Sequence, residues 1–279
     1  IVVLGGLFIL FLPKSWQGWA EMGTESWFPI GLFRRSGVGP LDDVWMLALS
    51  VVWKLALLLG CVGLFTRPAL VVATVLGVYL LGLPHNYGKV DHYDALLIFI
   101  FAILAVSRCG DALSIDSWRK KSAEPITPSG EYRWPIRCVW IVLSMIFFSA
   151  GYAKIANGGV AWVASDSMSR MLVKEIYNAD PWLHWGAWVA RTPWLPNLAA
   201  LATIVVEIGY PLALISRRAR LFFVPAMFGA QVGIYLFMGP AFWPFLICNA
   251  FWIPWTYLMV KARRGAADSA VAGDRVVAA

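Results

Sequence analysis

Residues 44–65 read VWMLALSVVWKLALLLGCVGLF, an apolar run that contains a single charged side chain, Lys54. At a rise of about 1.5 Å per residue, a helix of this length covers the roughly 30 Å hydrocarbon core of a bilayer. In the whole chain, 60% of the residues are hydrophobic and 14% are charged, whereas soluble domains carry roughly 25% charged residues. The run therefore indicates a transmembrane helix in an integral membrane protein.

The rest of the chain repeats this pattern. Further apolar stretches cover residues 68–83, 93–106, 134–153, 195–215, 221–242 and 243–260. Residues 1–12 are also apolar but shorter than the roughly 20 residues that a span needs. We expect them to be the remainder of a first span, with a signal peptide as the alternative. We predict an all-α, polytopic transmembrane bundle of about eight spans over residues 1–264, followed by a disordered cytoplasmic tail at 265–279.

The distribution of basic residues predicts how the bundle is oriented. Fourteen of the 23 lysines and arginines fall on one side of the eight spans, notably in 108–133, 217–220 and 261–264. Since cytoplasmic loops carry this excess, we expect a plasma-membrane protein with a cytoplasmic C-terminus. The segments expected outside are 14–43, 85–92 and 154–194. Because no basic face interleaves with aromatic residues, nucleic acid is not an expected partner.

The last of these outer segments predicts helices at the membrane surface. From Met168 to Ile176, apolar residues recur at helical spacing while the charged residues fall elsewhere. This pattern is typical of an amphipathic helix that lies in the interface. A tryptophan stripe from Trp182 to Trp188 follows. It can anchor the chain at the interface or stack on a substrate, and both interpretations stay open.

Two ionisable residues lie deep within apolar runs. Lys54 and Glu207 each stand about 15 Å from the outer end of their run. Charged groups in a bilayer are costly unless they are paired. Equal depth and opposite charge predict that Lys54 and Glu207 form an intramembrane ion pair, which can lock two helices together or take part in proton transfer.

The most polar stretch of the outer half lies between the third and fourth spans. It includes His85, Asp91 and His92. Two histidines and neighbouring aspartates can suggest a metal, but the spacing of His85 and His92 does not match a helical pair of ligands. We expect no metal here, and Asp91 can instead cap the following helix.

The fifth span ends on the same outer side. Residues 147–155 read FFSAGYAKI, and Trp162 follows. Lys154 can extend to the interface, or it can share an outward cavity with His92, because the span after His92 begins on the same face. A partly desolvated amine in such a cavity can act as a base.

Two segments, together with the order of the spans, resemble the HTTM superfamily, the membrane region of vitamin K-dependent gamma-carboxylase. The first is DHY at 91–93 with RCGDALSID at 108–116, and the second is AGYAK at 150–154 with Trp162 behind it. The likeness covers roughly residues 1–260. It implies the same helical membrane fold.

The resemblance also implies a chemistry. In the carboxylase, the lysine of the Ala-Gly-x-x-Lys motif deprotonates vitamin K hydroquinone. By position, Lys154 is the implied base and His92 the residue that orients the reacting oxygens. We expect Asp91, His85, Tyr152 and Trp162 to line the pocket around these two residues. The implied cofactor is reduced vitamin K or another quinol, without a metal, and the implied partners are membrane lipids and a peptide or protein substrate on the outer side.

Two functions remain open at this stage. One is a quinol-dependent, carboxylase-like membrane enzyme. The other is a non-enzymatic membrane module, such as a partner in peptide maturation or immunity, or a lipid-binding scaffold. Ala153 stands where the carboxylase has a second lysine, so the substrate is not given by the resemblance. The absence of a sequence repeat argues against a transporter.

Overall fold

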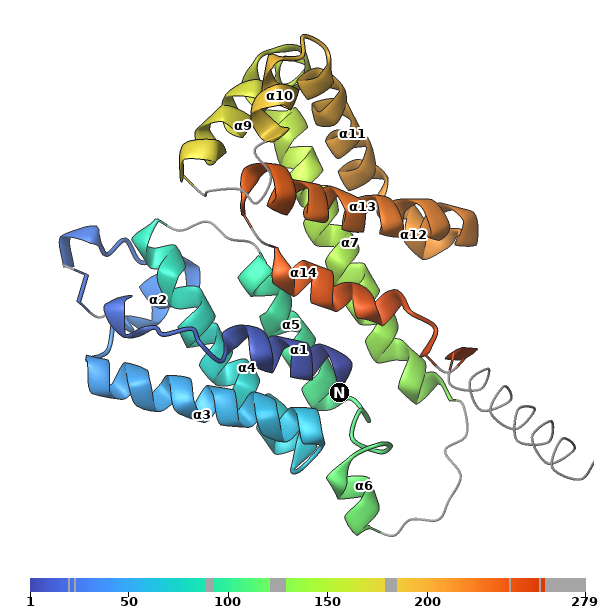
Figure 1. The fold of residues 1–279 in the computed structure, drawn as a ribbon. Coiled ribbons are helices and arrows are strands. Elements are labelled where there is room, and N and C mark those ends of the chain that lie inside the picture. The colour runs from blue at the N-terminus through green and yellow to red at the C-terminus, as the bar shows by residue number, and fades with distance from the viewer. Residues whose placement is uncertain are drawn as a thin grey trace, which may run out of the picture.

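A computed structural model describes residues 1–19, 21–22, 24–88, 93–120, 129–178, 185–240, 242–255 and 257–258. In these residues the chain forms helices and connecting turns, with no strand (Figure 1). The predicted all-α class is confirmed.

The helices differ widely in length. The longer ones are α1 (Val2–Phe11), α3 (Asp43–Val62), α4 (Thr66–Gly82), α5 (Tyr93–Val106), α7 (Gly130–Gly158), α9 (Ser167–Asn178), α11 (Leu195–Gly209) and α13 (Arg217–Met238). The shorter ones are α2 (Gly31–Ser36), α6 (Ile115–Arg119), α8 (Ala161–Ala164), α10 (Trp185–Arg191), α12 (Leu212–Ile215) and α14 (Trp243–Cys248). Single 3-10 turns are η1 (Gln17–Trp19), η2 (Thr24–Ser26), η3 (Leu83–Tyr87) and η4 (Asn249–Trp252).

Four of the described helices are long and apolar enough to cross a membrane. They are α3, α4 extended through η3, α7 and α13. The pair α10 and α11 gives a fifth span if it is counted as one, although it is bent by 102°. Helices α1 and α5 are apolar but shorter. The described chain therefore has fewer continuous helices of spanning length than the eight spans predicted.

Prolines interrupt two of the predicted spans. Residues 195–215 form α11 and α12 with a break at Tyr210 and Pro211. The stretch predicted at 243–260 is not one continuous helix: α14 has six residues, η4 follows, and the chain is extended at Ile253 before Pro254. Proline lacks the N–H that a helix needs, so both breaks have a local cause. At Ile253, the ring of Pro254 also disfavours helical geometry.

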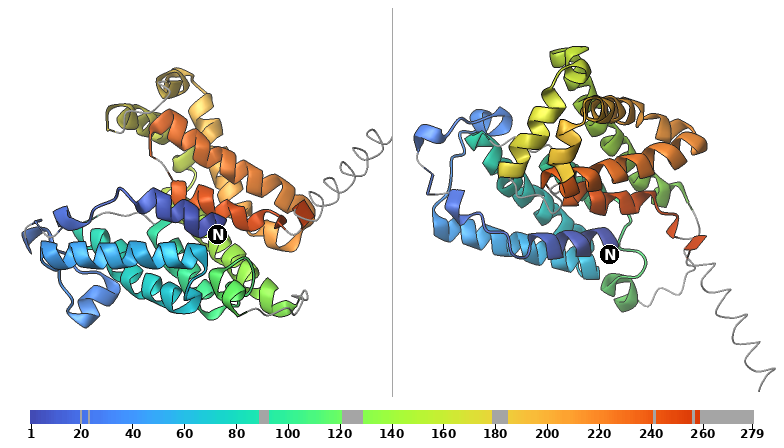
Figure 2. Two further views of the ribbon diagram at one scale, coloured as in Figure 1. Left: turned by 60° about the horizontal axis from the view of Figure 1, so that its bottom comes forward. Right: turned by 45° about the horizontal axis from the view of Figure 1, so that its top comes forward.

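Helix α7 joins the two parts of the bundle. It packs against α5 on one side and against α11 on the other. Helices α3, α4 and α5 pack in sequence order, while α1 lies beside α14 from the far end of the chain (Figure 2). The glycine at position 6 permits this approach, since a Cβ there would lie 3.3 Å from Ile247.

Aromatic side chains fill the core of the first part. Trp53 is fully buried and donates its indole N–H to the carbonyl of Ala73 at 2.9 Å. The rings of Phe11, Trp16 and Phe101 surround it. This packing fixes α3 against α1, α4 and α5.

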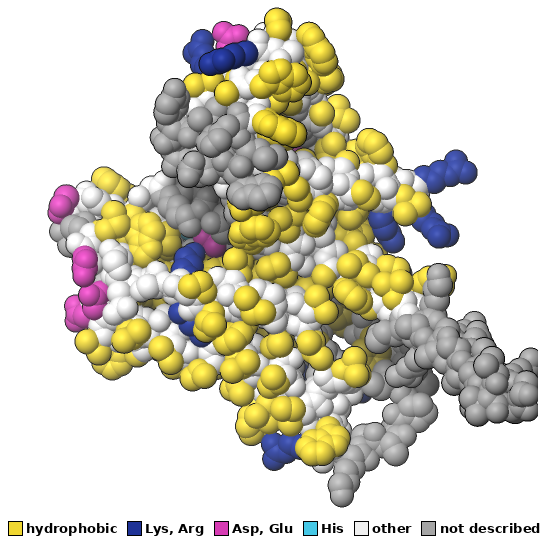
Figure 3. All heavy atoms as spheres, viewed as in Figure 1, with side chains coloured by type: hydrophobic (Ala, Val, Ile, Leu, Met, Phe, Trp, Pro, Cys, Tyr) yellow, Lys and Arg dark blue, Asp and Glu magenta, His cyan; other side chains and the backbone are white. Residues whose placement is uncertain are grey.

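The outer surface of the bundle is strongly apolar. Hydrophobic side chains cover much of the face shown in Figure 3. Val44 on α3, Val75 on α4 and Leu221 on α13 are 76%, 63% and 69% exposed. Apolar surface on this scale is typical of contact with lipid or with another protein, so it is compatible with a membrane location.

Candidate functional site

A partly buried ion pair joins α7 to α11. Lys154 Nζ lies 2.8 Å from Glu207 Oε1 and 2.7 Å from Oε2. The side chains of Lys154 and Glu207 are 25% and 13% exposed. The amine thus binds both oxygens of one carboxylate in a place with little solvent, where such charge-assisted hydrogen bonds are strong.

Gly151 explains why the pair forms at this point. A Cβ at position 151 would lie 2.9 Å from Glu207 Cβ and 3.1 Å from Ile208 Cγ1. The glycine therefore lets α11 approach α7 closely. Because residues three apart share a helix face, the same approach brings Lys154 to the carboxylate.

An aromatic ring closes the other side of the amine. Lys154 Nζ lies 5.6 Å from the centroid of the Trp162 ring, within cation–π range. Trp162 belongs to α8, and it packs against Gly158, where a Cβ would lie 2.9 Å from Trp162 Cβ. The two glycines thus let Glu207 and Trp162 approach the ammonium group of Lys154.

The predicted pairing of Lys54 with Glu207 is wrong. Lys54 Nζ instead donates to the backbone carbonyls of Leu12 at 3.0 Å and Lys14 at 2.7 Å. Helix α3 packs against α1, whose end leaves carbonyls without helical partners, whereas α11 packs against α7. Lys54 therefore stabilises the end of α1 and lies outside the candidate site.

Tyr152 is two residues from Lys154 but does not share its surroundings. Its side chain is 60% exposed and stacks on Phe148, with 6.4 Å between the ring centroids. Since residues two apart on a helix do not face each other, Tyr152 is separated from the ion pair.

A second polar group lies where η3 gives way to α5. His85 Nε2 is 3.6 Å from Oδ2 of Asp94, which is 1% exposed. Asp94 belongs to the polar stretch between the third and fourth predicted spans, and the structure brings it to His85. His92 and Asp91 lie outside the described residues, so their predicted roles are not tested. In the described ranges no three His, Cys, Asp or Glu side chains gather as metal ligands would.

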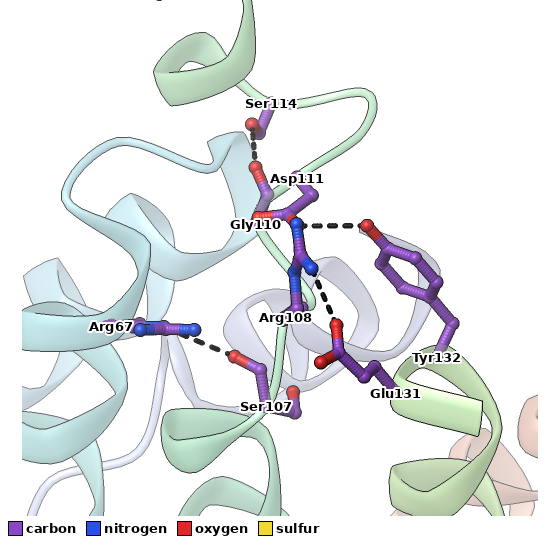
Figure 4. Close-up of polar contacts among 8 residues, drawn as sticks. All are labelled: Arg67, Ser107, Arg108, Gly110, Asp111, Ser114, Glu131 and Tyr132. Atoms are coloured by element: carbon purple, nitrogen blue, oxygen red, sulfur yellow. Dashed lines mark hydrogen bonds and ion pairs between the residues drawn. The ribbon is translucent and has the colours of Figure 1, made fainter. Parts of the chain in front are cut away.

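The segment at 108–116 links three helices at the other end of α7. Arg108 pairs with Asp111 through Nε and with Glu131 through Nη1, both at 2.5 Å (Figure 4). The Tyr132 hydroxyl donates to Asp111 at 2.9 Å. The bonds to Glu131 and Asp111 raise the pKa of Arg108. Burial alone would raise the pKa of Asp111, but the bonds from Arg108 and Tyr132 outweigh it and lower that pKa.

Asp116 extends this link to the turn between α3 and α4. Its carboxylate accepts the backbone N–H groups of Phe65 at 2.9 Å and Thr66 at 2.8 Å, and the Thr66 hydroxyl at 2.9 Å. Asp116 therefore caps α4 from a residue 50 positions away in the chain. The bonds from Thr66 and Phe65 lower the pKa of Asp116.

Close contacts show why this segment contains glycines and small residues. A Cβ at Gly110 would lie 2.7 Å from Thr66 Oγ1, and one at Gly63 would clash with Ser114. The motif at 108–116 is thus built to bring backbone segments together. Its contacts assign it a structural role in the described chain.

Comparisons with known proteins give no relative: no family model, no curated protein and no solved structure matches this chain. The resemblance to the HTTM superfamily therefore stays a prediction.

Proposed function

We propose that this chain is a multi-pass membrane enzyme of the HTTM type that acts on a lipophilic quinol, with Lys154 as the base at an outward-facing site. The observation that carries the proposal is the environment of the Lys154 amine. It stands near the end of α7, is mostly withdrawn from solvent, and is held between the Glu207 carboxylate and the Trp162 ring.

The chemistry asked of Lys154 is a proton transfer. In its neutral amine form, reached when the resting pair releases one proton to the outer water, Lys154 takes the proton of a quinol hydroxyl. The quinol becomes a quinolate, and Glu207 balances the ammonium that forms. The side chain of Lys154 is 25% exposed, so it is not sealed from the surroundings of the bundle. His92, by the resemblance, orients the quinol oxygens.

The positions of basic side chains support the proposed orientation. The Arg220 guanidinium lies 4.5 Å from the Trp140 ring and 5.1 Å from the Trp252 ring. The beginning of α13, the first half of α7 and the end of η4 are therefore at one end of the bundle. We assign this end to the cytoplasm and the Lys154 end to the outside of the plasma membrane.

The outer helices fit an interfacial position. In α9, Leu172 is buried, whereas on α10 Trp185 and Trp188 are 63% and 65% exposed. We propose that these two tryptophans lie at the level of the lipid headgroups, as interfacial aromatic residues do.

One observation favours a second candidate, a non-enzymatic membrane module. Lys154 and Glu207 satisfy each other and stand beside the tight contact at Gly151. In this second candidate, the ion pair holds α7 against α11 and has no catalytic role. The experiment must therefore separate the charge of Lys154 from its ability to lose a proton.

The Lys154→Arg variant makes this separation, since a guanidinium keeps the charge and the pair but does not act as a base at neutral pH. With vitamin K hydroquinone added to protein in liposomes, and dioxygen present as the oxidant, we expect both Lys154→Arg and Lys154→Ala to lower the rate of quinol consumption by about 10²- to 10⁴-fold. Bound quinone, measured by chromatography of extracts, should persist in Lys154→Arg and be lost in Lys154→Ala.

The control is Lys174→Ala, which removes an exposed lysine from α9 on the same side of the membrane. It should leave quinol consumption and bound quinone unchanged. Full turnover in Lys154→Arg would contradict the role of Lys154 as a base. The absence of quinone from the wild-type protein, together with no consumption, would favour the non-enzymatic module.

A further inference from the structure

An open hollow lies at the beginning of α7, at the end opposite Lys154. Its volume is about 520 Å³, within the range of small-molecule sites, roughly 300–1,000 Å³. The lining residues are Ser129, Gly130, Arg133, Trp134 and Arg137. Arg133 and Arg137 are four residues apart, so their guanidinium groups extend from one face of the helix.

The positive charge of this hollow is not compensated within the described chain. Neither Arg133 nor Arg137 forms an ion pair with a described residue. Glu131, the acidic residue in the first two turns of α7, is already bound by Arg108 (Figure 4). Two guanidinium groups without a described carboxylate partner thus line the hollow, which suits it to an anion.

The length of α7 places the hollow at the surface of the bilayer. The 29 residues of Gly130–Gly158 span roughly 43 Å, whereas the hydrocarbon core is about 30 Å thick. The surplus leaves room for the first turns, which carry Arg133 and Arg137, at the level of the headgroups. Trp134 is 37% exposed there, and the exposed Ile136 and Ile141 follow toward the hydrocarbon. An occupant can therefore have an anionic head beside the arginines and an apolar part along α7.

We propose that this hollow binds the phosphate of an anionic phospholipid on the cytoplasmic side. Arg133 and Arg137 hold the phosphate oxygens, for which the planar guanidinium is well matched. Ser129 makes no side-chain capping bond to α7, so its hydroxyl and the first amides of the helix add donors. The acyl chains lie along the apolar surface beyond Trp134.

The test uses the full-length protein, stripped of lipid in detergent and analysed by native mass spectrometry. The probes are dioctanoyl phosphatidylglycerol, dioctanoyl phosphatidylcholine and inorganic phosphate. We expect saturable binding of phosphatidylglycerol, weakened about 30-fold in the double variant Arg133→Gln/Arg137→Gln, which corresponds to about fivefold for each arginine.

The matched control is Arg217→Gln/Arg218→Gln, which removes two exposed arginines at the beginning of α13 and the same charge from the same side. It should bind phosphatidylglycerol as the wild type does. An unchanged thermal transition of Arg133→Gln/Arg137→Gln checks that the α7 changes leave the protein folded.

Three results would overturn the proposal: no saturable binding of phosphatidylglycerol, equal weakening in the α13 control, or equal binding of phosphatidylcholine. Inorganic phosphate that binds as tightly as the lipid would show an anion site without a lipid and would also overturn it. None of these results bears on quinol turnover at Lys154, so the two proposals fail independently.

Discussion

The two ends of α7 carry polar groups that are organised in opposite ways. At its beginning, Arg108 is 49% exposed and binds two carboxylates, one of which also accepts the Tyr132 hydroxyl. Near its end, Lys154 is 25% exposed and has a single carboxylate partner. A network in contact with water can lose one member and resolvate the others. A partly buried pair with a single partner on each side resolvates less readily, so its two residues depend on each other.

This difference predicts the largest effect on stability. Glu207→Gln should lower the free energy of unfolding by roughly 3 kcal/mol, because it leaves the Lys154 ammonium without its carboxylate in a site with little solvent. Replacement of both residues, Lys154→Met/Glu207→Met, should recover most of this loss, since no charge is then left unpaired. Unfolding in detergent, followed by circular dichroism during titration with sodium dodecyl sulfate, gives the comparison.

The control at the other end is Arg108→Gln, which removes the centre of the exposed network. It should destabilise the protein less than Glu207→Gln does. The contrast between the two ends fails if Arg108→Gln proves the more damaging change, or if the double Met variant is no more stable than the single Gln variant.

The helix contact beside the pair can be tested without a change of charge. Gly151→Ala should cost about 2 kcal/mol, because the new Cβ would lie 2.9 Å from Glu207 Cβ and would push α11 away from α7. Gly229→Ala is the matched control, since that glycine also lies within a long apolar helix, but a Cβ there would meet no described atom within 4 Å. It should be neutral or stabilising by up to about 1 kcal/mol. Equal thermal transitions for the two variants would mean that the contact at Gly151 is not tight.

Much of the fold could be predicted from the sequence because its signals are local. The apolar run at 44–65 became α3. The predicted spans at 195–215 and 243–260 were wrong as continuous helices, although Pro211 and Pro254 were local signals of the breaks. The spacing in Ala-Gly-x-x-Lys likewise places the glycine and the lysine on one face of α7, because residues three apart in a helix are neighbours. These features depend on residues within one or two turns of each other.

Partners from distant segments could not be predicted in the same way. Counting from the outer end gave Lys54 and Glu207 similar depths, but depth does not tell which helices are neighbours or which face a side chain occupies. The Asp116 cap on Thr66 joins residues 50 positions apart. The uncompensated positive charge of the hollow at Arg133 depends on the ion pair between Glu131 and Arg108. None of these contacts could be predicted without knowing how the helices are arranged in space.

The smallest predicted effect concerns the Asp116 cap and depends on pH. Asp116→Asn should lower stability at neutral pH by about 1 kcal/mol, because the amide binds the N–H groups of Phe65 and Thr66 less well than a carboxylate does. The pKa of Asp116 is lowered in the folded protein, first by the bond from Thr66. Its stabilisation is therefore complete above the pKa of the unfolded chain, about 3.9, and is lost as the pH falls through the lower folded value.

The stability difference between the wild type and Asp116→Asn should accordingly be constant from pH 7 to about pH 5 and shrink below pH 4. Asp166→Asn, at an 80% exposed carboxylate that lies 3.9 Å from Arg170, should change stability by no more than about 0.5 kcal/mol. A difference for Asp116→Asn that grows as the pH falls would have the wrong sign for a carboxylate cap. The link from α6 to α4 would then depend on the close contact of Gly63 with Ser114 rather than on charge.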